Sequence, residues 1–186
     1  MLHDVTSALE KGHVRIVVEA VPGAGKTHLI LQLSSFASTL VLAYNSLLAA
    51  NISRELCPDH SVCMTYHALC GRYIALARDD FDLDQIVSEV ESGERAVTSY
   101  PTFHQVFIDE AQDVRPLYIR LLRVLNLLTS STRIFVAGDR KQLVYDFDED
   151  FPASLDVLCK PPEAVHPGVW VRVKSNYTQR LTGPMC

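Results

Sequence analysis

The sequence predicts an α/β fold, a three-layer sandwich in which helices cover both faces of a mostly parallel sheet. Short apolar segments rich in Val and Ile alternate along the 186 residues with longer segments of helical period. The short segments are continuously apolar rather than alternating, which is typical of strands buried on both faces. Repeated strand–helix alternation favours parallel pairing, because the intervening helices provide the crossover connections.

Each element follows from this pattern. The expected strands cover 14–18, 40–43, 62–64, 106–108, 133–137 and 169–173. The expected helices cover 26–36, 47–56 and 68–77, and a further helix with apolar positions from Val114 to Leu125 follows the strand at 106–108. Residues 79–100 are acidic and least periodic, so we expect a surface insertion with one short helix and a solvated face. The whole chain, 1–186, is expected to form a single domain.

The composition places the chain among folded globular proteins, with 48% hydrophobic and 21% charged residues. A formal net charge of −5 argues against non-specific capture of nucleic acid, although a local basic groove is compatible with it.

The five cysteines include no CxxC pair, and no signal-peptide pattern precedes them. We therefore expect a reduced intracellular compartment, cytoplasm or nucleus, and no secretion. No apolar run approaches the roughly 18 residues of a membrane span, so no membrane partner is expected.

The segment between the first strand and the first long helix has the pattern of a phosphate-binding loop. It matches at every defined position except the first, where the motif has Gly and this chain has Ala; the residues are Ala20, Val21, Pro22, Gly23, Ala24, Gly25, Lys26 and Thr27. The glycines leave room for backbone N–H groups to face phosphates. Lys26 is expected to reach the β- and γ-phosphates of ATP, and the Thr27 hydroxyl to ligate Mg²⁺. With His28, these residues form the expected ATP-binding set. The alternative is a strand-to-helix turn that matches by chance, which the surrounding strand and helix disfavour.

An acidic pair, Asp109 and Glu110, directly follows the strand at 106–108. The carboxyl ends of strands in open α/β sheets are where ligands bind. Asp109 is expected to hold Mg²⁺, and Glu110 to orient or deprotonate the attacking water. An acidic pair there could instead cap the following helix, but the preceding phosphate loop favours the catalytic interpretation. A third polar cluster, 138–142, ends the strand at 133–137 on the same predicted edge.

These segments resemble the motifs of superfamily 1 DNA helicases of the UvrD/Rep type, in order along nearly the whole chain. They are 20–27 for motif I, 42–45 for motif Ia, 64–70 for motif Ib, 109–113 for motif II, 138–145 for motif III and 176–182 for motif IV. Motif I of this family often begins with Ala, and the DEAQD string at 109–113 is a specific signature.

The resemblance implies a RecA-like P-loop NTPase domain, the first motor domain of a helicase. Its catalytic residues would be Asp109, Glu110, Gln142 and Arg180, where Gln142 senses the γ-phosphate and Arg180 contacts phosphate. Its nucleic-acid residues would be Tyr44, Asn45, Thr65, His67, Tyr145 and Phe147. Aromatic faces stack on bases of any sequence at about 1–3 kcal/mol each, which suits a motor on single-stranded DNA or RNA. For each aromatic residue, core packing is the alternative.

The chain also departs from the family pattern. The family has an adenine-reading Gln before motif I, whereas residues 1–19 contain none. The family usually inserts a subdomain between motifs Ib and II, where this chain has only 71–105. The second RecA-like domain is absent, so we expect it to be supplied in cis or in trans.

Three functions from different classes remain open at this point. The chain is either the ATP-hydrolysing half of a helicase, a helicase-like remnant that binds nucleotide or a partner without turnover, or another P-loop enzyme such as a nucleotide kinase. The motif II and motif III strings disfavour the kinase. A zinc site is a further alternative, because Cys57, His60, Cys63, His67 and Cys70 lie close together in the sequence. Without tight Cys pairs, this spacing is unlike that of structural zinc sites.

Overall fold

A six-stranded, all-parallel sheet forms the centre of the computed structural model, which describes residues 2–12, 14–20, 24–129, 131–138 and 171–175. The strands are β1 (Arg15–Ala20), β2 (Thr39–Leu42), β3 (Ser61–Met64), β4 (Gln105–Ile108), β5 (Arg133–Gly138) and β6 (Val171–Ser175). They lie side by side in the order β3-β2-β4-β5-β1-β6. The predicted α/β class and parallel sheet are confirmed.

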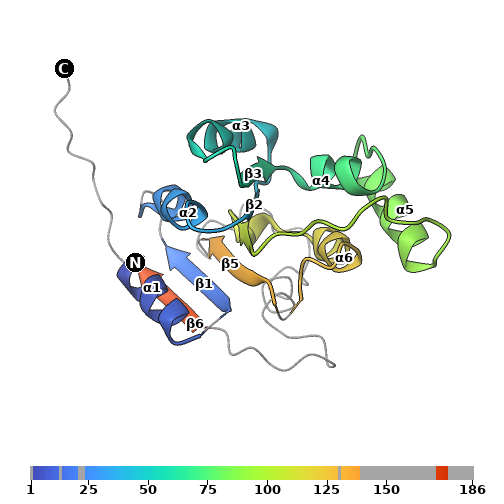
Figure 1. Cartoon of the computed structure of the whole chain (residues 1–186). Coiled ribbons are helices and arrows are strands. Elements are labelled where there is room, and N and C mark those ends of the chain that lie inside the picture. Colours follow the sequence, from blue (N-terminus) through green and yellow to red (C-terminus); the bar gives the residue numbers. More distant parts are fainter. Residues whose placement is uncertain (1, 13, 21–23, 130, 139–170, 176–186) are drawn as a thin grey trace, which may run out of the picture.

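Helices pack on both faces of this sheet and give three layers (Figure 1). They are α1 (Leu2–Glu10), α2 (Lys26–Ser34), α3 (Ser46–Glu55), α4 (Tyr66–Tyr73), α5 (Asp80–Glu91) and α6 (Pro116–Val124), with a 3-10 turn, η1, at Ala111–Asp113. Helices α1, α2 and α3 share one apolar cluster, and α4, α5 and α6 share the other. Successive strand residues alternate between them: Leu40 and Leu42 face the α4–α6 layer, whereas Val41 faces the α1–α3 layer.

The strand positions follow the apolar runs closely, and the main differences from expectation concern helices. Helix α1 was not predicted. Helix α4 begins at Tyr66 instead of 68, because the Thr65 side chain accepts a hydrogen bond from the backbone N–H of Ala68 and caps the helix there. Among the described residues, no helix combines the length and apolar character needed to cross a membrane.

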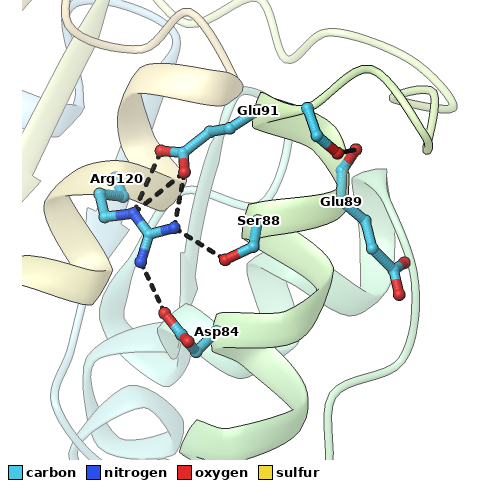
Figure 2. Close-up of polar contacts among 6 residues, drawn as sticks. Asp84, Ser88, Glu89, Glu91 and Arg120 are labelled. Atoms are coloured by element: carbon cyan, nitrogen blue, oxygen red, sulfur yellow. Dashed lines mark hydrogen bonds and ion pairs between the residues drawn. The ribbon is translucent and has the colours of Figure 1, made fainter.

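Helix α5 corrects the prediction that 79–100 is a surface insertion with one short helix. The helix has 12 residues, and its apolar face packs in the α4–α6 core through Leu83, Ile86 and Val87. Its acidic face is not merely solvated either. Arg120 of α6 donates to Asp84, Ser88 and Glu91, three residues on one side of α5 (Figure 2). Thus α5 is an integral part of the domain.

Candidate functional site

Two of the strands carry predicted site residues to one edge of the sheet. Because all strands are parallel, their carboxyl ends meet at the same edge. The phosphate-loop segment follows β1, the acidic pair follows β4, and β5 lies between these two strands. The topology thus places the predicted phosphate and metal residues along a single rim.

The N-terminus of α2 is arranged for an anion. Gly25 precedes the helix in the left-handed conformation (φ 85°, ψ 28°), which glycine adopts without steric cost. No side chain in the described part of the chain caps this terminus, so its N–H groups remain available to phosphate oxygens. Lys26 is buried, with its Nζ 3.9 Å from Oε2 of Glu110, whereas Thr27 and His28 are exposed.

Asp109 and Glu110 adjoin each other at the end of β4 but occupy different environments. Asp109 is only 3% exposed, and its Oδ1 accepts a 2.9 Å hydrogen bond from the backbone N–H of Glu110. Burial, followed by the Glu110 charge, raises the pKa of Asp109 to about 6. Glu110 has a left-handed backbone (φ 47°, ψ 51°), and its side chain is 30% exposed. The same two causes, burial and the Glu110 charge, raise the pKa of Asp113.

This cluster has an excess of negative charge. The carboxylates of Asp109 and Glu110 face one buried cation, Lys26, and Asp113 adds to the field. A divalent cation would relieve that repulsion, and carboxylate and hydroxyl oxygens are ligands that Mg²⁺ accepts. The oxygen donors of Asp109 and Thr27 therefore fit the expected magnesium ligands.

Several predicted residues fall outside the part of the chain that the structure describes. They are Val21, Pro22, Gly23, Gln142, Tyr145, Phe147 and Arg180. Ala20 is described as the last residue of β1, and Ala24 is buried near the start of α2. The assigned roles of these residues stay predictions.

Of the predicted nucleic-acid residues, Asn45 and Thr65 have clear structural roles. Asn45 Oδ1 accepts a 2.8 Å hydrogen bond from the backbone N–H of Leu48 and caps α3. Thr65 caps α4 in the same way. Such caps stabilise helices by about 1 kcal/mol and account for these residue types without nucleic acid.

Tyr44 and His67 are part of a polar cluster that sequence reasoning missed. Tyr44 hydrogen-bonds Arg115, and Arg115 Nη1 forms an ion pair with Asp80. The same Asp80 accepts a 3.1 Å hydrogen bond from the Tyr118 hydroxyl, and His67 Nε2 lies 3.2 Å from its Oδ1. Arg115 closely follows the DEAQD string, which was the one sequence signal that could have drawn attention to it.

The cysteines and histidines considered for zinc are divided by the sheet. Cys63 packs in the α1–α3 cluster and Cys70 in the α4–α6 cluster. Cys57 Sγ lies 3.8 Å from His60 Nδ1, but within the described ranges no three His, Cys, Asp or Glu side chains are placed to hold a metal ion.

Comparison with known proteins agrees with this fold. Residues 5–148 match the family model described as "AAA domain", and the chain belongs to that family. A search of curated proteins gives no significant match. The fold is that of a RecA-like domain, which solved helicase structures share, whereas the narrower UvrD/Rep assignment stays a prediction.

Solved helicase structures share the fold at low sequence identity. The chain is similar to a Bacteroides Pif1 helicase double mutant (15% identity, TM-score 0.54, covering 98% of this chain and 42% of that one). It is also similar to Bacteroides sp. Pif1 in complex with ADP-AlF4 (16% identity, TM-score 0.50, covering 96% of this chain and 42% of that one). A third similar structure is the Pyrococcus furiosus Hef helicase domain (10% identity, TM-score 0.53, covering 95% of this chain and 38% of that one). The chain thus spans less than half the length of these helicase chains.

Proposed function

We propose that this chain binds MgATP at the carboxyl edge of its sheet and hydrolyses it as the first motor domain of a superfamily 1 helicase. The observation that carries the proposal is the meeting of Lys26, at the open N-terminus of α2, with the acidic pair that ends β4. A buried lysine beside two carboxylates suits a site that binds a polyphosphate together with a cation.

Each residue has a distinct role in this proposal. Lys26 and the N–H groups at the start of α2 bind the phosphates, and Thr27 and Asp109 hold Mg²⁺. Bound Mg²⁺ neutralises negative charge on the phosphates. Glu110, more exposed than Asp109, accepts a proton from the water that attacks the γ-phosphate.

The same rim continues towards Tyr44 and His67, which we propose contact single-stranded nucleic acid. Pif1 helicases, which share this fold, are described as unwinding forked double-stranded DNA. For this chain, a second RecA-like domain in cis or in trans would complete the motor, because translocation requires two domains that close and reopen around ATP.

Calorimetry with MgATP tests the proposal directly. Replacing Lys26 with Ala removes a charge-assisted phosphate contact typically worth about 1.5–3 kcal/mol, so affinity should fall by about 10- to 150-fold. Lys11→Ala removes an exposed lysine outside the site and is the matched control. Equal affinities for wild type and Lys26→Ala would refute the proposed phosphate site.

A further inference from the structure

Arg115 is placed between the nucleotide rim and the proposed nucleic-acid surface. It follows η1, is the N-terminal flanking residue of α6, and has a half-exposed side chain. Its guanidinium contacts the side chains of Tyr44 and Asp80. Asp80 is the one carboxylate paired with it in the part of the chain that the structure describes.

Asp80, at the start of α5, is shared among several donors. Besides Arg115, it accepts a hydrogen bond from Tyr118, whose ring stacks on Tyr66 with centroids 4.2 Å apart. The contact of His67 Nε2 with Asp80 lacks hydrogen-bond geometry, so this buried nitrogen has no hydrogen-bond partner among the described residues. The Asp80 carboxylate is thus contacted by Arg115, Tyr118 and His67, but it leaves His67 Nε2 without a hydrogen bond.

The topology explains why these groups meet. Tyr44 follows β2, His67 follows β3 and Arg115 follows β4, and these three parallel strands are neighbours in the sheet. Their carboxyl ends therefore form one continuous rim with Asp109 and Glu110.

We propose that Arg115 binds a backbone phosphate of single-stranded nucleic acid and that Asp80 occupies its guanidinium when no strand is bound. The inference rests on the proposed function. A planar guanidinium accommodates carboxylate and phosphate in the same two-pronged geometry, so the two anions compete for it. Both side chains of the Arg115–Asp80 ion pair are partly exposed, so replacing the carboxylate by a phosphate at Arg115 costs little free energy.

Exchange at Arg115 does not require α5 to detach. The helix remains held by its buried apolar face and by the contacts of Arg120 with Asp84 and Glu91 (Figure 2). Asp80 is thus a local competitor that lowers affinity for the strand, while the remainder of α5 keeps its position.

Fluorescence anisotropy with a labelled oligo-dT strand over a range of salt concentrations tests the inference. Arg115→Ala should weaken binding by about tenfold and reduce the salt slope by about 0.7, the value for one lost phosphate contact on a single strand. Arg115→Lys keeps the charge but loses the two parallel N–H donors of the guanidinium. It should therefore bind the strand with intermediate affinity and an unchanged salt slope. Asp80→Asn should tighten binding by about two- to fivefold, because it removes the competing charge.

Arg78→Ala and Asp82→Asn are matched controls, because Arg78, just before α5, forms another Arg–Asp pair with Asp82 in the first turn of that helix. Wild-type affinity for Arg115→Ala, or a loss of affinity in Asp80→Asn, would overturn the inference. Absence of strand binding by the wild type would overturn the inference too. Calorimetry with MgATP on the same sample then shows separately whether the proposed nucleotide site binds MgATP. If thermal unfolding shows that Arg115→Ala is not folded, Arg115→Lys and Asp80→Asn decide the question.

Discussion

At the residue scale, burial assigns different tasks to the two neighbouring carboxylates. Asp109 is fixed by burial and by the hydrogen bond from the Glu110 backbone, which suits a metal ligand that must not move. Glu110 retains a partly exposed side chain beside Lys26, which suits a group that meets water. Substitution of each residue alone should therefore have different consequences.

Glu110→Gln should retain MgATP binding and lose hydrolysis. The substitution preserves shape and leaves Asp109 intact while removing a general base, which typically contributes about 10²–10⁴-fold in rate. Calorimetry should give an affinity close to that of wild type, and a phosphate-release assay should show turnover reduced at least about 10²-fold. Glu94→Gln, an exposed site, is the control. Equal losses of metal-dependent binding in Glu110→Gln and Asp109→Asn would contradict the division of roles.

Asp109→Asn should stabilise the metal-free chain at neutral pH. With a folded-state pKa of about 6 against an ordinary value of 3.8, the folded chain binds the proton more tightly than the unfolded chain. The contribution of Asp109 to the free energy of unfolding therefore falls as pH rises from about 4 to about 6 and stays lower above that range. Ionised Asp109 thus destabilises the fold by about 1–3 kcal/mol.

Urea unfolding in EDTA at several pH values measures this effect as the difference between wild type and Asp109→Asn. The difference should be small near pH 4 and favour the variant at pH 7.5. Asp59→Asn, at an exposed position, provides the comparison. A variant less stable than wild type at pH 7.5 would mean that the charged form is favoured in the fold.

Sequence reasoning found the residues whose type and spacing are imposed by the chemistry. Lys26, Asp109 and Glu110 follow strand ends in a recognisable order, and the fold brings Lys26 and Glu110 together. The Arg115–Asp80 pair could not be found in this way. Its members lie in separate helical segments, and nothing in either local pattern indicates that α5 packs against α6.

At the element scale, Arg120 of α6 joins three residues of α5 through polar contacts. Arg120→Ala should loosen α5 without unfolding the domain, because Leu83, Ile86 and Val87 remain buried. Partly exposed ion pairs contribute little individually, so we expect a loss of about 1 kcal/mol for this network. Hydrogen exchange should become faster in 80–91 and stay unchanged in β4. Arg123→Ala, an exposed position of the same helix, should leave exchange unaltered.

Elements with a single strong pattern were predictable, and those with mixed signals were not. β4 and β5 are short apolar runs and were placed within about a residue of their observed bounds. Helix α1 has only nine residues and buries only Val5 and Ala8, so its apolar stripe is short and was not recognised as a helix. Helix α5 carries its apolar residues among many acidic ones, so its charge obscured a buried face that only tertiary packing reveals.

At the scale of the whole molecule, the purified 186-residue polypeptide should hydrolyse ATP slowly and unwind no duplex. An arginine that stabilises charge on the transferring phosphoryl group is worth about 10³–10⁵ in rate, and in helicase motors it is expected from a second domain. Arg180, the candidate within this chain, lies outside the described residues. Phosphate release with and without single-stranded DNA, together with a strand-displacement assay, measures both properties. Processive unwinding by the monomer would contradict the prediction.

The left-handed backbone of Glu110 lowers the free energy of unfolding of the chain. A residue other than glycine in the left-handed conformation costs roughly 1 kcal/mol or more, and here it also repels a buried neighbour. Substitution of Glu110 by glycine would remove both penalties in a single step. The folded chain is therefore less stable with the glutamate that the proposed hydrolysis requires than it would be without it.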